Sequence, residues 1–302
     1  MKRSILATVA VAASIPLLAA CSGTSSGTST DSGPSIVAST SAWGSIAQAI
    51  GGDAVSVTSI ITDASQDPHS FEGSARVQLE LKNAALVIEN GGGYDDWMDT
   101  LLAGAGNPDA PVLDAAELSG YDEHPADGEF NEHVWYDFPT VQKVADRIAS
   151  ELSALVPADA ATFAANAKAF DAKLVALEAR EAALRANTNG AGAAITEPVP
   201  LYMLTASGFT NVTPAAFSEA IEEGTDVSPT VLEQTLQLFS SHTATVLVYN
   251  EQTSGPETDK VLAAATAAGV PVVAVTETMP QDVSGYLDWM SQNIAALERL
   301  YS

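Results

Sequence analysis

The chain contains few cysteines and few basic residues, and each shortage excludes a class of protein. Cys21 is the only cysteine among 302 residues, so no internal disulfide can form. Lys and Arg number 12 against 38 Asp and Glu, which gives a formal net charge of −26. Binding to nucleic acid requires a basic face, so we expect no nucleic-acid partner. A negative field of this kind attracts small cations. A net negative charge can also do no more than keep a protein soluble.

Long apolar runs are scarce as well, and the clearest one lies at the N-terminus. Lys2 and Arg3 precede an apolar run over residues 5–18, which has the length of a signal-peptide core and is too short to span a membrane. The run ends in Leu18-Ala19-Ala20-Cys21, which resembles the bacterial lipobox, whose cysteine is lipidated. We predict a signal peptide over 1–20 and an extracytoplasmic protein anchored to the membrane by lipid at Cys21. A chance cysteine after an ordinary signal peptide is the alternative.

The rest of the chain alternates between strand and helix patterns in two halves. A flexible polar tether over 21–34 comes first. Short apolar, β-branched segments predict strands at 36–39, 55–61, 86–88, 111–113, 193–196, 245–249 and 270–275. Residues 158–187 contain neither Gly nor Pro and favour one long helix of roughly 45 Å. We predict two Rossmann-like α/β lobes, 35–157 and 189–302, joined by a rigid linking helix over 158–188.

Two histidines lie in short acidic loops that each follow a strand unit and precede a helix. His69 stands in Asp-Pro-His-Ser-Phe-Glu over 67–72, and His133 in Asn-Glu-His-Val-Trp-Tyr-Asp over 131–137. Glu197 and Glu277 each come directly after a buried strand of the second half. Open α/β sheets bind ligands beyond the carboxyl ends of their strands. We therefore expect these four side chains to meet in a cleft between the lobes.

Two imidazoles and two carboxylates form an N₂O₂ set that suits a divalent transition metal. The two negative charges would neutralise the ion, and the ion would offset the cost of burying carboxylates. The other histidines fit this pattern less well. His124 lies in an acidic loop and is expected to be exposed, with low-affinity capture of ions as a minor alternative. His242 is expected at a helix end before a strand.

Several of these segments together resemble one family. The segments at 67–72, at 90–97 (Asn-Gly-Gly-Gly-Tyr-Asp-Asp-Trp) and at 133–137 (His-Val-Trp-Tyr-Asp), with the long helix, resemble the zinc- and manganese-binding solute-binding lipoproteins of bacterial ABC transporters. The resemblance covers nearly all of the chain after the signal peptide. It implies a monomer that carries one Mn²⁺ or Zn²⁺ ion to a membrane permease and is not an enzyme.

The resemblance also implies the ligands. His69 and His133 correspond to the first two, and Glu197 to a third that is often His in zinc-type and Glu in manganese-type members. Glu277 corresponds by position to the fourth, although Thr-Glu-Thr at 276–278 departs from the usual Asp-centred sequence. The long histidine-rich loop of many zinc members is absent. Oxygen-rich ligation favours manganese as cargo, whereas the Irving–Williams order predicts tighter zinc binding in vitro.

Other functions remain open from the residues. A zinc metallohydrolase would use three ligands and a metal-bound water, but the sequence has no His-Glu-x-x-His, no Gly-x-Ser-x-Gly and no phosphate loop. A surface adhesin with an incidental metal site is a second alternative. A bilobal receptor for siderophores or corrinoids is a third, and it would not need the two histidine loops.

Overall fold

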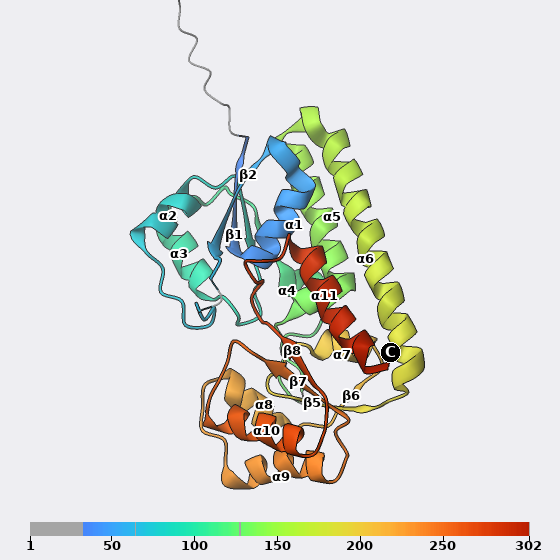
Figure 1. Ribbon diagram of the computed structural model, residues 1–302. Coiled ribbons are helices and arrows are strands. Elements are labelled where there is room, and N and C mark those ends of the chain that lie inside the picture. Colours follow the sequence, from blue (N-terminus) through green and yellow to red (C-terminus); the bar gives the residue numbers. More distant parts are fainter. Residues whose placement is uncertain (1–32, 64, 127, 302) are drawn as a thin grey trace, which may run out of the picture. The chain divides into compact units, whose positions relative to one another are not determined.

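Two parallel four-stranded sheets form the framework, one in each half of the chain (Figure 1). The computed structural model describes residues 33–63, 65–126 and 128–301, so the predicted signal peptide and Cys21 lie outside the described residues. The first sheet has the strand order β2-β1-β3-β4 and the second β6-β5-β7-β8. Their bounds are β1 Ser35–Thr40, β2 Ser56–Ile61, β3 Leu86–Glu89, β4 Val112–Asp114, β5 Gly192–Ile195, β6 Thr210–Asn211, β7 Val246–Asn250 and β8 Val272–Val275. The predicted pair of α/β lobes is confirmed.

The strand order explains where a ligand can bind. In each sheet the first strand of the half lies in the middle, with the second strand on one side and the third on the other. The chain therefore leaves neighbouring strands in opposite directions, and a crevice opens beyond their carboxyl ends. Strands β3 and β7 are buried along their whole length, as is typical of parallel sheets covered by helices. The crevices of the two sheets carry the loops that hold the candidate ligands.

Helices cover the sheets and connect the strands. They are α1 Ser41–Gly51, α2 Ala75–Lys82, α3 Trp97–Ala105, α4 Ala115–Ser119, α5 Phe138–Leu155, α6 Ala160–Thr188, α7 Leu201–Ala206, α8 Ala215–Glu222, α9 Pro229–Ser240, α10 Pro256–Ala267 and α11 Tyr286–Glu298. Single 3₁₀ turns lie at Gly52–Ala54, Val134–Tyr136, Pro157–Asp159 and Arg299–Tyr301. Apart from a helix end near His242, which corresponds to the end of α9, the sequence pattern had predicted no element between 199 and 244, where α7, β6, α8 and α9 lie. None of the helices in the described part of the chain is both long enough and apolar enough to cross a membrane.

The long helix α6 connects the two halves of the molecule (Figure 1). Its buried residues recur at alternating intervals of four and three, which is the spacing of a single seam along a helix. They are Phe163, Ala167, Phe170, Leu174, Leu177, Glu181, Leu184 and Thr188. The seam packs on α5 and α1 in the first half and on α7 and α11 further along. One acidic residue, Glu181, interrupts this apolar seam.

Helix α11 provides a second connection between the halves, because the chain returns to the first half after β8. The Tyr286 hydroxyl donates a 2.6 Å hydrogen bond to the carbonyl of Trp135, and the Tyr136 hydroxyl donates one of the same length to the carbonyl of Thr276. All three aromatic side chains are buried. One continuous apolar cluster thus extends from the first sheet to the second. Two helices and a shared core hold the halves together, which restrains their relative movement.

Candidate metal centre

A stiff loop after β2 presents His69. The Asp67 carboxylate accepts the backbone N–H of His69 at 2.9 Å and the hydroxyl of Ser70 at 2.6 Å, closing a local turn. The indole N–H of Trp97 donates to the carbonyl of Pro68 at 2.9 Å and anchors the loop on α3. The imidazole of His69 meets the ring of Tyr94 edge to face, with centroids 4.9 Å apart. The loop is therefore preorganised, which lowers the entropy cost of binding a ligand.

His133 is fully buried and immediately precedes the Val134–Tyr136 turn. Its Nδ1 lies 2.8 Å from Oδ1 of Asn131, so Nδ1–H donates to that oxygen. This tautomer leaves the lone pair of Nε2 free to point away from Asn131. The rings of Tyr94 and Trp135 lie 5.9 and 5.0 Å from the imidazole and fix its orientation.

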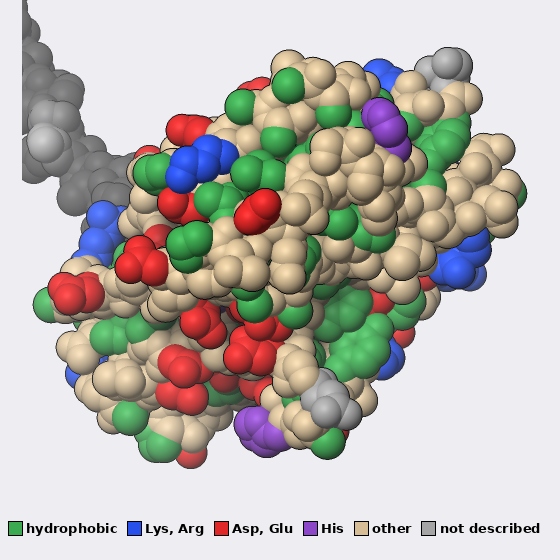
Figure 2. Space-filling view, turned by 90° about the horizontal axis from the view of Figure 1, so that it is seen from below, with side chains coloured by type: hydrophobic (Ala, Val, Ile, Leu, Met, Phe, Trp, Pro, Cys, Tyr) green, Lys and Arg blue, Asp and Glu red, His purple; other side chains and the backbone are tan. Residues whose placement is uncertain are grey.

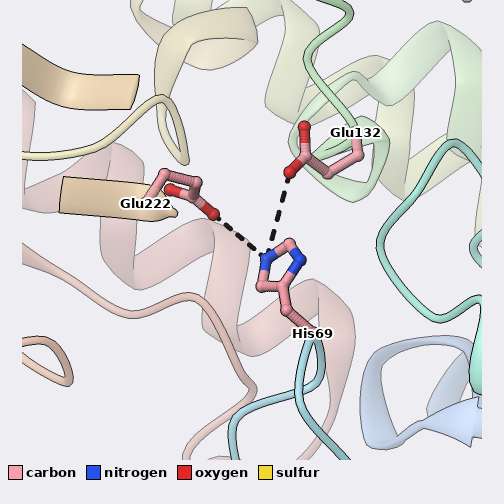
Figure 3. Close-up of side chains that lie close together, drawn as sticks. All are labelled: His69, Glu132 and Glu222. Carbon is pink, nitrogen blue, oxygen red and sulfur yellow. Dashed lines mark hydrogen bonds and ion pairs between the residues drawn. The ribbon is translucent and has the colours of Figure 1, made fainter. Parts of the chain in front are cut away.

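The carboxylate of Glu222 lies between the two imidazoles (Figure 3 shows its contact with His69). Glu222 is the last residue of α8 and lies in the second half of the chain. Its Oε1 is 3.2 Å from Nε2 of His69 and 3.2 Å from Nε2 of His133. Glu132 adds a carboxylate oxygen 3.9 Å from Nε2 of His69. The two halves thus meet through Glu222 and the histidines.

Glu277 reaches the same point from the loop after β8. Its Oε1 accepts a 2.9 Å hydrogen bond from the hydroxyl of Tyr94, and its backbone N–H donates to Oε1 of Gln252 at 2.9 Å. One ligand atom from each of His133, Glu222 and Glu277 lies within 4.8 Å of the others. His69, Glu132 and Glu222 form a second such group that shares Glu222. Two overlapping groups around one carboxylate indicate a single centre.

Glu197 lines the same cleft but stands outside both groups. It is only 3 % exposed, and its carboxylate interacts with the side chains of Asn250 and Thr253. Its Oε2 is buried without a hydrogen-bond partner. Burial and the charges of Glu222 and Glu277 raise the pKa of Glu197 to about 8. Of the four residues predicted as ligands, three are brought to the groups around Glu222, and Glu197 lies beside them.

The electrostatics of the centre indicate a missing positive charge. Burial alone would lower the pKa of His133, but the carboxylates of Glu222 and Glu132 outweigh this effect and raise it. Glu222, together with Glu277, likewise raises the pKa of His69 against the effect of burial. Both imidazoles in turn hold the pKa of Glu222 below its ordinary value, although burial acts to raise it. The carboxylates therefore favour a positive charge at this point, which a bound cation would supply.

Two polar atoms at the middle of the centre are buried without a hydrogen bond. They are Nε2 of His133, whose 3.2 Å approach to Glu222 lacks hydrogen-bond geometry, and Oε2 of Glu222. Buried polar atoms are nearly always paired, so each exception calls for an explanation. An imidazole lone pair and carboxylate oxygens that converge in this way are ligands for a divalent metal ion.

The centre lies in a cleft of about 1000 Å³ that residues from both halves line. Figure 2 shows Asp and Glu side chains gathered along the middle of the face seen from below. Of the described residues that line the cleft, none is Lys or Arg. A low-dielectric cleft with acidic walls raises the local concentration of cations.

Comparison with known proteins agrees with this chemistry. Residues 36–300 match the protein family described as zinc-uptake complex component A, periplasmic (ZnuA). The chain belongs to this family. The resemblance inferred from the sequence is thereby confirmed, because the match covers nearly all of the described residues.

Individual relatives differ in the metals that their names give. The manganese-binding lipoprotein MntA of Halalkalibacterium halodurans is 31 % identical over 161 residues, which cover 51 % of each chain. The iron ABC transporter substrate-binding lipoprotein MtsA of Streptococcus pyogenes serotype M1 is 30 % identical over 167 residues, covering 52 % of this chain and 53 % of that one. The chain thus spans about half the length of the curated relatives it matches. The periplasmic zinc binding protein TroA from Treponema pallidum has the same fold, with a TM-score of 0.74 at 16 % identity over 89 % of this chain and 99 % of that one.

Glu222 was not among the residues predicted from the sequence. It lies in the stretch for which no element had been predicted, and Ile-Glu-Glu at 221–223 has the pattern of an ordinary solvated helix end. The feature that could have identified Glu222 is its place at the end of a helix beside the crevice. A helix that follows β6, at the edge of the second sheet, ends where the crevice opens, so its last residues face the loops of the first sheet.

Proposed function

We propose that this protein captures one divalent transition metal ion outside the membrane and delivers it to an ABC-type permease for import. The observation that supports this most directly is the convergence of unpaired buried atoms of His133 and Glu222 beside His69 and Glu277. Membership of the family and the names of the relatives agree with it. The chain then acts as a receptor that binds and releases its ion without catalysis.

We propose that His69, His133, Glu222 and Glu277 bind the ion. Glu222 supplies the carboxylate that had been assigned to Glu197 from the sequence. Glu197 remains a proposed additional ligand, because its Oε2 is buried beside the centre without a donor. Four protein donors suffice for tetrahedral Zn²⁺, whereas Mn²⁺ prefers more oxygen ligands and a higher coordination number.

Mn²⁺ is our proposed physiological cargo. The centre offers two nitrogens and at least two carboxylates, with Glu132 and Glu197 close by, and this oxygen-rich set suits manganese. Zn²⁺ is expected to bind more tightly in solution, because the Irving–Williams order places it above manganese at almost any such site. Which of the two ions the protein carries in the cell would then depend on how much of each metal is available.

The location and organisation of the protein complete the proposal. We propose an extracytoplasmic monomer that is anchored to the membrane by lipid at Cys21, with a tether that reaches residue 34. The ligand-bearing lobes would be 35–157 and 189–302, joined by the linking helix 158–188. The relatives MntA and MtsA are named as lipoproteins, and MtsA as the substrate-binding component of an ABC transporter, which supports the anchor and the permease partner.

Metal titration tests the proposal. Metal-stripped protein is titrated with Mn²⁺ and with Zn²⁺, and its metal content is determined by elemental analysis after desalting. We expect one ion per chain and a loss of affinity of at least roughly tenfold in His69→Ala and in His133→Ala. Glu233→Gln, an exposed acid on α9, is the matched control and is expected to bind like the parent. No stoichiometric metal, or unchanged affinity in both histidine variants, would refute the proposal.

A further inference from the structure

A second hollow lies next to the cleft, beyond the carboxyl ends of β3 and β4. Its volume is about 430 Å³, and it shares Gly92, Gly93 and Glu123 with the lining of the cleft. Of the described residues that line it, none is Lys or Arg. Its carboxylates are those of Glu89, Asp95, Asp96, Asp99, Asp114 and Glu123.

Two of these carboxylates have ordinary structural partners. Asp95 accepts the backbone N–H groups of Asn90 and Gly91, each at 2.8 Å. Asp114 accepts the backbone N–H of Glu117 at 2.9 Å and caps α4. Its carboxylate also packs against Gly91, where a Cβ atom would come within 2.2 Å of Oδ1. Asp95 and Asp114 are therefore explained by the turn and the helix that they hold.

Glu89 has no such explanation. It is the last residue of β3, lies beside Asp114 in the register of the sheet, and is only 8 % exposed. Its carboxylate lines the hollow, and burial and neighbouring charges, with no hydrogen bond, account for its electrostatics in the described part of the chain. Burial, and then the charge of Asp95, raises the pKa of Glu89 to about 8. A buried carboxylate without a donor or a cation is destabilising, so its presence here indicates a partner.

We propose that this hollow binds a second divalent cation of the hard, oxygen-preferring kind, such as Ca²⁺, through Glu89, Asp114 and Asp99. The hollow offers carboxylate oxygens, which are among the ligands that Ca²⁺ prefers. His124 also lines it but is exposed.

The geometry predicts a hydrated and weakly held ion. Among the described residues, no three side chains of this hollow bring ligand atoms within 4.8 Å of one another, in contrast to the centre around Glu222. An ion bound here keeps several water molecules between itself and the carboxylates. We expect a dissociation constant of roughly 0.1–1 mM, as in weak extracellular Ca²⁺ sites. This site does not depend on the transport function proposed above.

Calcium titration with site-specific variants tests the inference. The full chain is titrated with Ca²⁺ by calorimetry after its metal centre has been saturated with Mn²⁺, and also as the His133→Ala variant. We expect one Ca²⁺ per chain in both cases and at least a roughly tenfold weaker affinity in Glu89→Gln. Asp99→Asn, in which an exposed residue is changed, is expected to weaken binding without any effect on folding. Glu117→Gln, an exposed acid on the neighbouring helix α4, is the matched control and is expected to leave Ca²⁺ affinity unchanged.

Three results would overturn the inference. The first is no Ca²⁺ binding up to roughly 10 mM, well above the weakest affinities expected. The second is unchanged Ca²⁺ affinity in both Glu89→Gln and Asp99→Asn. The third is loss of Ca²⁺ binding in His133→Ala, which would assign the ion to the cleft. None of these results bears on whether Mn²⁺ or Zn²⁺ binds in the cleft, so the two proposals fail separately.

Discussion

The hydroxyl of Tyr94 donates a 2.9 Å hydrogen bond to Oε1 of Glu277 across 183 positions of sequence. Tyr94 belongs to the first half of the chain and Glu277 to the loop after the last strand of the second half. The same aromatic ring contacts both His69 and His133. One side chain therefore orients a proposed ligand from the second half and packs on two proposed ligands from the first.

Removal of that hydroxyl tests its positioning role. Tyr94→Phe keeps the ring against both imidazoles but leaves Oε1 of Glu277 without its donor. We expect the affinity for Mn²⁺ to fall roughly tenfold, as is usual when a group that orients a metal ligand is lost. A competition titration with a metal-binding dye measures the change. Tyr121→Phe, at a half-exposed stacked tyrosine outside the two ligand groups, is the control, and equal affinities in both variants would contradict this role.

Glu222 and Glu197 should contribute differently to the binding of the two metals. Glu222→Gln removes the carboxylate between the imidazoles and is expected to weaken Mn²⁺ and Zn²⁺ alike, by at least roughly tenfold. Glu197→Gln is expected to weaken Mn²⁺ more than Zn²⁺, because zinc is satisfied by four ligands whereas manganese takes more oxygens. Parallel titrations of both variants with both metals measure the difference. If Glu197→Gln removed binding of both metals while Glu222→Gln had no effect, the assignment of Glu222 would be wrong.

Metal affinity should rise with pH. The carboxylates around His69 and His133 raise the pKa of both imidazoles, that of His133 to about 9, so each imidazole holds its proton to a higher pH than a free histidine does. Only neutral imidazole binds a metal ion, so binding must release these protons. We expect affinity to increase from pH 6 to pH 8, with protons released as the ion binds at pH 7. Calorimetry in buffers of different ionisation enthalpy counts the protons, and an affinity independent of pH would contradict the proposed ligands.

Glu181 should make the folded state less stable as the pH rises. It lies in the buried seam of α6, its Oε1 has no hydrogen-bond partner, and burial raises its pKa from 4.5 to about 8. Because this pKa is higher in the folded than in the unfolded chain, the folded state binds more protons between these values, and stability falls across that window. Glu181→Gln is expected to stabilise the protein by about 1–3 kcal/mol at pH 8 and by less at pH 5.

Thermal unfolding of metal-free protein at the two pH values measures this effect. Glu233→Gln on α9 is the control, since its side chain is exposed and its substitution should leave the melting temperature unchanged at both pH values. A melting temperature of Glu181→Gln that equals the parent's at pH 8 would show that the seam accommodates the charged carboxylate.

The sequence was sufficient for the two lobes, the long helix and the loops of His69 and His133, because these features follow from local patterns. Strand periodicity, the absence of Gly and Pro over 158–187, and the position of Glu277 after a strand can each be read over a few residues.

The remaining features depend on tertiary contacts. Helix α3 begins only at Trp97, because Asp95 accepts the N–H groups of Asn90 and Gly91 and holds the preceding residues in a turn. Glu222 could not be recognised because its partners lie in loops about 90 and 150 positions away, and no local pattern distinguishes it from the solvated Glu223.

The most direct measurement is a crystal structure of the protein with one equivalent of Mn²⁺, analysed by anomalous scattering at the manganese edge. We expect one strong peak per chain, roughly 2.0–2.3 Å from Nε2 of both His69 and His133 and beside the carboxylates of Glu222 and Glu277. A map without a peak between the two imidazoles, or with its strongest peak elsewhere on the chain, would contradict the proposed metal centre.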